Sequence, residues 1–251
     1  MDNVDEFRLE KHSGFVAFFD ILGYQSFLQA KNSPEDAVKR VLSAIVNAKQ
    51  EVPKHAIEKF KLDESDLADV RWLVFSDTIL IAVTVKDGED DDMKQFKFIL
   101  LIALCGVLQR YMFDFGLPVR GAITEGDFFL TSKEACFAGL PIIAAYELCS
   151  KLDLAACVIE TEVARKYIKH DWETPINYRI PLKGGGEADY YTVTPIMHHP
   201  DGSWKGKDIR QLVAESFWDH GKQISRPAQI KLENTELLFR RFKLLFKDRF
   251  A

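Results

Sequence analysis

Several familiar sequence signals are missing from this chain. Its four cysteines form no CxxC pair, which argues against a tetrahedral zinc site, and a chain of 251 residues does not need disulfides to fold. The first ten residues are polar and acidic and contain no apolar segment typical of a signal peptide. The longest apolar run, residues 98–108, is shorter than the roughly 18–20 residues needed to cross a bilayer. We therefore expect a cytoplasmic protein in a reducing compartment, with no membrane partner.

An excess of basic charge is also missing. Lysine and arginine number 33 against 38 aspartates and glutamates, which gives a net charge of −5 and a pI of about 5.7. Such a chain has no overall attraction to nucleic acid, so we expect no nucleic-acid partner, and a phosphate-bearing ligand needs a local site or a metal ion. The length and the 47% hydrophobic content fit one core over residues 1–205, with residues 206–251 as a helical extension of the same domain.

Short apolar runs alternate with helical patterns along the chain. Strands are predicted at residues 15–20, 70–75, 78–85, 117–125 (closed by Gly126) and 156–160, with two more within 178–194 around a turn of three glycines at 184–186. Helical patterns begin at Tyr24 and Pro34 and cover residues 93–113, 139–152, 161–170 and 209–250, the last broken around Pro227. The order βαββαββαβ predicts an α/β (α+β) fold with a mainly antiparallel sheet and C-terminal helices.

Two aspartates stand at the ends of apolar runs. Asp20 closes the run 15–20, and Asp77 lies in the two-residue gap between 70–75 and 78–85, which is hairpin spacing. Either residue alone fits a helix cap or a turn. Because a hairpin tip beside the end of a central strand brings two carboxylates to one pair of hard cations, the pair predicts a Mg²⁺ or Mn²⁺ site. Two such ions suit phosphoryl transfer on a nucleoside triphosphate.

The residues after Asp20 favour a phosphate-binding turn. Leu22, Gly23 and Tyr24 combine a turn with the start of a helix, where unpaired N–H groups can hold the β- and γ-phosphates. Gly23 allows a phosphate to approach the backbone closely. We expect all three residues to bind substrate.

At this point the sequence resembles the class III nucleotidyl cyclases. Residues 18–24 (FFDILGY) resemble the first metal-binding strand of that family, and 75–77 (FSD) resemble its second metal-binding aspartate at a hairpin tip. Residues 117–126 (LPVRGAITEG) resemble the R-x-G-x-x-x-G strand, although Gly121 directly follows Arg120, and 137–139 (FAG) resemble the start of the next helix. These motifs cover about residues 15–151 in the family's order.

The resemblance implies a ferredoxin-like βαββαβ core and head-to-tail homodimers with active sites at the interface. It also implies conversion of a nucleoside triphosphate into its 3′,5′-cyclic monophosphate. Carried over to this sequence, Asp20 and Asp77 bind two Mn²⁺ or Mg²⁺ ions, and the backbone carbonyl of Ile21 binds one of them.

The departures from the family pattern bear on the substrate. The position of the purine-reading Lys or Glu is Leu73, and the second base-contact position is Cys136. The family's transition-state Asn and Arg fall at Ile143 and Glu147, neither of which stabilises a developing phosphorane charge. Purine turnover by the usual route is therefore not expected.

A branch of the superfamily shares this pattern. Residues 139–148 (GLPIIAAYEL) resemble the pyrimidine cyclases of the bacterial anti-phage system called Pycsar, and the match weakens after about residue 160. Those enzymes make cyclic UMP or cyclic CMP as an alarm for a separately encoded effector. The resemblance implies a uridylate cyclase, with CTP as the alternative substrate. A catalytically inactive nucleotide-binding module and another two-metal phosphoryl enzyme, such as a nuclease, are the competing hypotheses.

Three further residues have two interpretations each. Arg71 either contacts the base or a phosphate, or is a solvated arginine at a strand edge. Arg120 either supplies transition-state charge or forms a structural ion pair. Tyr146 either stacks on or hydrogen-bonds to a small base, or is an ordinary core aromatic.

Overall fold

The computed structural model describes residues 9–28, 34–131, 137–195, 208–219 and 225–246. Two of the sequence predictions lie outside these residues. Cys136 is one, and the boundary between residues 205 and 206 is the other.

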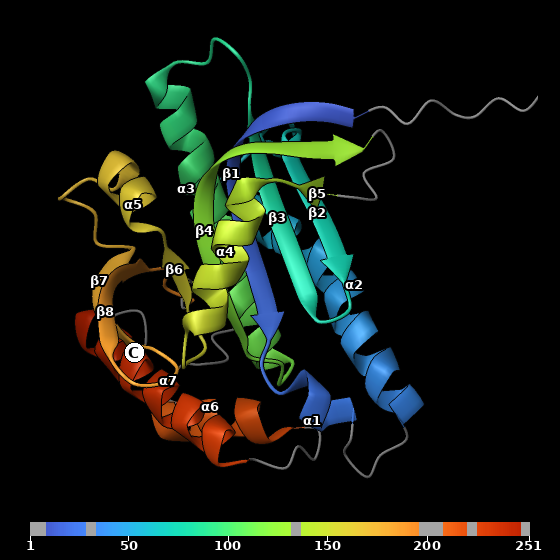
Figure 1. Cartoon of the computed structure of the whole chain (residues 1–251), viewed down its shortest axis with the longest axis vertical. Coiled ribbons are helices and arrows are strands. Elements are labelled where there is room, and N and C mark those ends of the chain that lie inside the picture. The colour runs from blue at the N-terminus through green and yellow to red at the C-terminus, as the bar shows by residue number, and fades with distance from the viewer. Residues whose placement is uncertain (1–8, 29–33, 132–136, 196–207, 220–224, 247–251) are drawn as a thin grey trace, which may run out of the picture.

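The first half of the chain forms an antiparallel sheet of four long strands. Strand β1 (Leu9–Ile21) is central, with β3 (Thr78–Val85) on one side and β4 (Val119–Thr131) on the other, and β2 (Val70–Phe75) lies outside β3. The short α1 (Tyr24–Leu28) and the long α2 (Pro34–Phe60) lead from β1 to β2, and α3 (Asp91–Asp114) leads from β3 to β4 (Figure 1). This arrangement is the expected ferredoxin-like βαββαβ core.

The second half of the chain extends this sheet. Strand β6 (Cys157–Ile159) pairs in parallel with β4, followed by the antiparallel hairpin of β8 (Glu187–Thr192) and β7 (Ile176–Pro181). The sheet order is β2-β3-β1-β4-β6-β8-β7, and β5 (Phe137–Ala138) pairs with β4. The remaining helices are η1 (Glu64–Leu67), α4 (Leu140–Lys151), α5 (Thr161–Tyr167), α6 (Ile209–Trp218) and α7 (Arg226–Leu245). The prediction of a mainly antiparallel α/β fold is confirmed.

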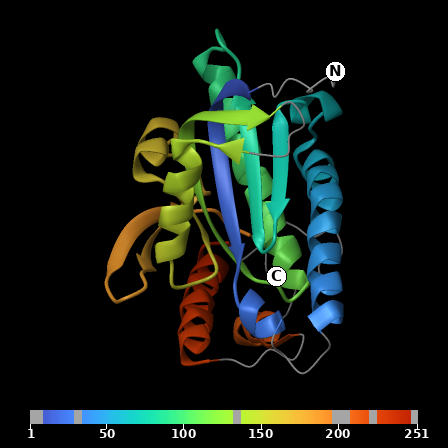
Figure 2. The ribbon, with the colours of Figure 1, turned by 45° about the vertical axis from the view of Figure 1, so that its right-hand side comes forward.

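Both faces of the sheet are covered, which explains the unbroken apolar run in β1. Phe15 and Phe19 lie in a core with α2 and α3, whereas Val16 and Phe18 lie in a core with α4, α6 and α7. Successive side chains of a strand point to opposite faces, so every side chain of a central strand between two cores is buried and apolar residues are favoured at each position. Figure 2 shows α2 and α4 on opposite sides of the sheet.

Helix α3 is mostly apolar, and its apolar residues lie on more than one side. Of the helices that the structure describes, it alone is long and apolar enough to cross a membrane by length and composition, and 67% of its most apolar stretch is buried inside the protein. A helix that is hydrophobic all round belongs in a core or needs a cover on each side.

Two predicted strands are too short. Strand β1 begins at Leu9, six residues before the predicted start at residue 15. Strand β4 does not end at Gly126 but continues to Thr131, because Gly126 pairs with Gly14 of β1 and both strands run on past this glycine pair. A Cβ on Gly14, whose φ is +152°, would lie 2.2 Å from the carbonyl oxygen of Val83. At the other end of the chain, the break predicted around Pro227 is confirmed, because α6 ends at Trp218 and α7 begins at Arg226, with Pro227 in its first turn.

Candidate functional site

The two predicted aspartates meet at one edge of the sheet. Asp20 is the penultimate residue of β1, and it stands opposite Thr78 of β3 and Arg120 of β4. The next backbone N–H, that of Ile21, donates to the carbonyl oxygen of Asp77 at 3.1 Å. The tip of the β2–β3 hairpin therefore lies directly beside the end of β1.

The hairpin turn that carries Asp77 has an unusual conformation. Only Ser76 and Asp77 separate β2 from β3, and Ser76 has φ +56°. A positive φ at the first central position is typical of a type II′ turn, where glycine is usual, and a side chain there costs on the order of 1–3 kcal/mol. Such local strain is common where a neighbouring residue has to be held in place for function.

Asp20 is held by a bidentate contact from Arg120. Nε and Nη2 of Arg120 lie 2.8 and 2.6 Å from Oδ2 of Asp20, and the two side chains are 13% and 25% exposed. Nη1 of the same guanidinium donates to the carbonyl oxygens of Ser150 and Leu152 at 3.3 and 3.2 Å, where α4 ends. Arg120 thus forms the ion pair that was one of its two interpretations. Among the described residues nothing binds Oδ1 of Asp20, so that oxygen remains available to a cation.

Some of the backbone groups in the turn after Asp20 are already hydrogen-bonded within the protein. The N–H of Leu22 donates to the carbonyl oxygen of Pro118 at 2.8 Å, and the Leu22 side chain is buried. Gly23 is exposed with φ +78°, and its carbonyl accepts from Phe27 within the first turn of α1. The first N–H groups of a helix have no partner inside it. The N–H of Tyr24, rather than that of Leu22, is therefore the group placed to meet an anion.

A cavity of about 230 Å³ opens beside this turn. Asp20, Ile21, Leu22, Gly23 and Arg120 line one side of it. Ser26 of α1 lines it too, and the other side comes from segments far along the chain, including Lys183, Phe217, Ser225, Pro227, Ala228 and Lys231. The structure thus brings five of the predicted site residues to one cavity, which Asp77 adjoins through Ile21 but does not line.

Two lysines in this cavity were not predicted as site residues. Lys183 begins the turn between β7 and β8, and burial together with the charges of Arg120 and Lys231 lowers its pKa, while Asp20 acts in the opposite direction. Lys231, from the second turn of α7, forms an ion pair with Asp153 at 3.2 Å. The described lining of the cavity holds three cations and one aspartate, Asp20, with Asp153 behind Lys231, and this excess of positive charge suits a polyphosphate.

The sequence contained only weak signals for these lysines. Lys183 directly precedes the three-glycine turn, and Lys231 belongs to a tail whose basic residues fit a solvated helix face equally well. Their approach to Asp20 depends on how β7, β8 and α7 pack on the core.

The two predicted base-contact residues on β2, Arg71 and Leu73, lie in different environments. Leu73 stands opposite Leu80 and packs against the core that includes α4. Arg71 lies four residues before the end of β2, about 13 Å from it along the strand. Its Nη1 donates to the carbonyl oxygens of Ala68 and Val70 at 2.6 and 3.1 Å. Arg71 is therefore anchored at the far end of β2 from the hairpin tip.

The residues singled out on α4 are at the surface. Tyr146 is 55% exposed and its ring meets that of Phe18 edge-on, with centroids 5.5 Å apart. Ile143 and Glu147 are exposed as well, and Leu140 is 80% exposed. Phe18 precedes Asp20 by two residues on the same face of β1, so Tyr146 lies on the Asp20 side of the sheet.

The donor set fits a metal site that is completed by substrate. The described residues contain no group of three or more His, Cys, Asp or Glu able to hold a metal ion. The site offers instead two carboxylates, of Asp20 and Asp77, and the carbonyl of Ile21. Magnesium is usually bound by one or two carboxylates together with substrate phosphates, rather than by a cage of protein ligands.

Comparisons with known proteins give likenesses of structure only. No protein-family model and no curated protein matches the sequence. The guanylyl cyclase Cya2 is similar at TM-score 0.49 and 13% identity, over 76% of this chain and 95% of that one. The catalytic core of a rhodopsin-guanylyl cyclase with converted specificity, in complex with ATPαS, is similar at TM-score 0.48 and 12% identity, over 74% of this chain and 98% of that one. A class III adenylyl cyclase-like ATP-binding protein from Pseudomonas aeruginosa is similar at TM-score 0.49 and 13% identity, over 94% of this chain and 44% of that one.

These values lie below a TM-score of 0.5, and the identities are low. The likenesses therefore assign no activity, and the function has to be inferred from the site itself.

Proposed function

We propose that this protein is a metal-dependent nucleotidyl cyclase that converts a nucleoside triphosphate into its 3′,5′-cyclic monophosphate and pyrophosphate. The observation that carries the proposal is the meeting of Asp20 and Asp77 through the Ile21–Asp77 hydrogen bond, beside a cavity rich in cations. In the reaction the 3′ oxygen bonds to the α-phosphorus, the bond from that phosphorus to the β-phosphate breaks, and the 3′ proton is released.

Each part of the site has a role in this reaction. Asp20, Asp77 and the carbonyl of Ile21 hold two Mn²⁺ or Mg²⁺ ions. When bound, such ions lower the pKa of the 3′-hydroxyl and neutralise the leaving phosphates. Lys183 and Lys231 receive the triphosphate with the turn at Gly23 and Tyr24.

Arg120 fixes the carboxylate of Asp20 and is a positioning residue. Two nitrogens of its guanidinium donate to Asp20, and the third donates to backbone carbonyls at the end of α4. An aspartate locked in one rotamer needs no rearrangement when a cation binds.

We infer that the base is a pyrimidine, with UTP favoured and CTP as the alternative. Leu73 offers no hydrogen bond at the position where a purine reader is expected, and it belongs to an apolar core. Tyr146 and Cys136 are the proposed base contacts, and Arg71 is a weaker one because backbone carbonyls bind its guanidinium. We propose that the cyclic UMP is a signal in anti-phage defence. It is made in the cytoplasm and acts on a separately encoded effector.

We further propose a homodimer with sites at the interface. Support comes from apolar side chains left exposed on α4 and at the hairpin tip, namely Leu140, Ile143, Tyr146 and Phe75. Ile143→Asp should give a monomer by size-exclusion chromatography and abolish activity, whereas Leu237→Asp, at an equally exposed apolar position on α7, should do neither. An active Ile143→Asp monomer would exclude interfacial sites.

The activity is tested by incubating the purified protein with each of the four triphosphates and Mn²⁺ and resolving the products by chromatography. Cyclic UMP is the expected main product, and Asp20→Asn or Asp77→Asn should abolish it. Asp87→Asn, an exposed loop aspartate, is the matched control and should leave activity unchanged. Cyclic AMP or cyclic GMP as the main product would overturn the pyrimidine assignment.

A second candidate function is an inactive, nucleotide-binding relative of the cyclases. The exposed Ile143 and Glu147 favour it, since neither side chain stabilises transition-state charge. Calorimetry separates the two: the inactive module binds a triphosphate with Mg²⁺ yet forms no cyclic product from any of the four. Cleavage of RNA or DNA in the same assay series would point to the nuclease hypothesis instead.

A further inference from the structure

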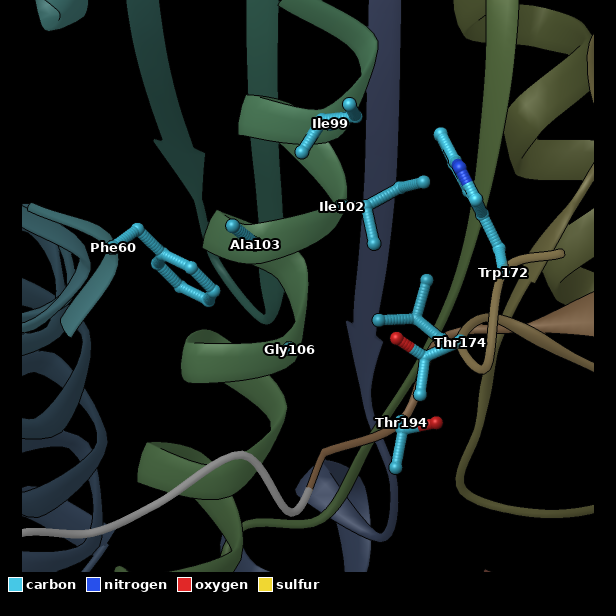
Figure 3. A pocket seen from close by; sticks show the side chains of 9 residues that line it. Phe60, Ile99, Ile102, Ala103, Gly106, Trp172, Thr174 and Thr194 are labelled. Atoms are coloured by element: carbon cyan, nitrogen blue, oxygen red, sulfur yellow. The ribbon is translucent and has the colours of Figure 1, made fainter. Parts of the chain in front are cut away.

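Among the described residues, two other cavities lack the positive charge that a phosphate needs. One, of about 160 Å³, lies beside α3 with apolar walls that include Phe60 and Trp172 (Figure 3), and no charged side chain of the described residues lines it. The other, of about 470 Å³, is formed by the end of α3 and by α6, and its charged lining residues are Asp114, Glu215 and Asp219. A polyphosphate therefore finds counter-charge in the cavity at Asp20 and in neither of these.

One short segment contacts all three cations of the Asp20 cavity. The segment, residues 150–155, runs from the last turn of α4 toward β6. Two of its carbonyl oxygens accept from Nη1 of Arg120 at 3.3 and 3.2 Å. The carbonyl oxygen of Lys151, which lies between them in the sequence, accepts from the backbone N–H of Lys183 at 2.8 Å. The backbone of this segment thus places two of the cations.

The third cation is held by a side chain of the same segment. Nζ of Lys231 lies 3.2 Å from Oδ1 of Asp153, and the two side chains are only 16% and 18% exposed. The backbone N–H of Asp153 donates to the carbonyl oxygen of Pro181 at 3.1 Å, two residues before Lys183. The three cations therefore keep their relative positions only as long as segment 150–155 keeps its own.

Helix α7 holds this segment from outside the cavity. Nδ2 of Asn234 donates to the carbonyl oxygen of Asp153 at 2.9 Å, and the backbone N–H of Ala155 donates to Oγ1 of Thr235 at 2.8 Å. With Lys231, these two residues of α7 have the spacing i, i+3 and i+4, so all three lie on one face of the helix. Neither Asn234 nor Thr235 is among the described residues that line the cavity, so they act on it through the segment.

The hydroxyl of Thr235 is explained by the segment that it holds. Thr235 is fully buried in α7, and its hydroxyl donates to the carbonyl oxygen of Lys231 at 2.6 Å, a contact that slightly destabilises a helix. Valine would fill the same space without a polar group. Ala155, however, precedes β6, and without Oγ1 of Thr235 its buried N–H would have no partner.

We propose that Thr235 and Asn234 are positioning residues for the phosphate-binding cations at Asp20. Helix α7 holds segment 150–155, and this segment sets where the three cations of the cavity stand when a polyphosphate chain binds. The inference rests on the proposed function for the class of ligand, a polyphosphate, and not for the reaction performed on it.

The test is a calorimetric titration of the full chain with sodium tripolyphosphate in the absence of divalent metal. The wild type should bind. Thr235→Val should weaken binding about five- to tenfold, which is the net effect of about one hydrogen bond. Thr235→Ser keeps the hydroxyl and loses a buried methyl group, so it should unfold more easily and yet bind within about twofold of the wild type. This pair separates the position of the segment from the stability of the fold.

Thr84→Val is the matched control for the loss of a buried hydroxyl. Thr84 is 5% exposed, and its hydroxyl donates to the carbonyl oxygen of Asp69 at 3.3 Å, at the far end of β3 from Asp77. The control should change the affinity for tripolyphosphate by less than about twofold. In the cyclase assay Thr235→Val should raise the KM for the triphosphate by the same factor as in calorimetry and change kcat less.

A second pair of variants decides the matter if Thr235→Val does not fold. Asn234→Ala should weaken tripolyphosphate about three- to fivefold, since it removes the neighbouring contact to the segment. Gln229→Ala, which removes a contact with Glu233 on the same helix, should have no effect.

Three results would overturn the proposal: a wild type that binds no tripolyphosphate, a full-strength complex with both Thr235→Val and Asn234→Ala, or an equal loss of affinity in Thr235→Ser and Thr235→Val. A wild type that binds tripolyphosphate and forms no cyclic product would contradict the cyclase function, and the role of α7 would still stand.

Discussion

Arg120 places Nε and Nη2 at 2.8 and 2.6 Å from a single oxygen, Oδ2, of Asp20. The contact joins neighbouring strands at the very end of β1, and it makes the arginine a partner of the proposed metal ligand.

The first prediction follows from that contact. Arg120→Ala should lower cyclic-product formation about 10- to 100-fold, as is usual for a residue that orients a metal ligand. The concentration of Mn²⁺ needed for half-maximal activity should rise as well, because Asp20 then has to be ordered when the ion binds. Arg165→Ala, which removes a surface arginine paired with Glu162, is the control and should change neither value. Initial rates over a range of Mn²⁺ concentrations provide the measurement, and an unchanged Mn²⁺ dependence would show that Arg120 acts on the substrate directly.

The second prediction concerns Lys183. Lys183→Ala should raise the KM for the triphosphate about tenfold and leave kcat within about threefold, because a charge-assisted contact to a phosphate is lost in both the ground state and the transition state. Lys49→Ala, an exposed lysine on α2, should leave both constants unchanged. A fall in kcat with KM unchanged would contradict the proposed role.

The third prediction is the pH dependence of that same lysine. Burial and the nearby charges of Arg120 and Lys231 lower the pKa of Lys183 from its ordinary 10.5. The positive charge is present below the lowered pKa and is lost as the pH rises through it, so affinity for a non-hydrolysable triphosphate with Mg²⁺ should fall on the alkaline side earlier than for an ordinary lysine. Lys183→Arg should remove this fall, since arginine stays charged. Titrations between about pH 8 and 10.5 would detect it.

The fourth prediction compares two threonines near the end of β8. Thr194→Val should raise the free energy of unfolding by up to about 1 kcal/mol, because it replaces an unpaired buried hydroxyl with a methyl group of similar size. Thr192→Val should lower it by about 1 kcal/mol, because that hydroxyl is hydrogen-bonded to Cys157. Urea unfolding in the absence of ligand gives both values. A loss of stability in Thr194→Val would mean that its hydroxyl has a partner.

The fifth prediction tests the glycine pair between β1 and β4. Gly14→Ala should cost more than about 3 kcal/mol, because the added Cβ meets the carbonyl oxygen of Val83 at 2.2 Å on a backbone with φ +152°. Gly184→Ala also has a positive φ, +83°, but its Cβ meets nothing within 4 Å, so about 1–2 kcal/mol is expected. Similar costs for the two variants would show that steric contact is not what requires Gly14.

Local sequence pattern was enough to predict the core strands and the place of the aspartates. Residues 70–75 and 78–85 are bounded by the turn residues Ser76 and Asp77, and the structure reproduces both strands without a change. The run 15–20 is apolar without alternation because both faces of β1 are buried, and this condition marks a central strand. The metal and base-contact roles of these residues remain predictions.

Features that depend on distant contacts were harder to predict. Gly126 looked like a strand end, since a lone glycine gives no sign that another glycine stands opposite it. Lys231 was not predicted as a site residue, because its place beside Asp153 and the Asp20 cavity results from the packing of α7 on the core. Thr194 carries no local signal, since an unpaired hydroxyl is visible only once all its neighbours are in place.

The β7–β8 hairpin reaches from α3 to the cavity of Asp20. Val193 and Thr194, just past its open end, lie against Gly106 of α3, and Lys183, at its turn, lines the cavity of Asp20. Six residue pairs connect the two ends, a ladder about 20 Å long. Because backbone hydrogen bonds join the two strands along this ladder, the packing of the open end on α3 helps to set where Lys183 stands beside Asp20.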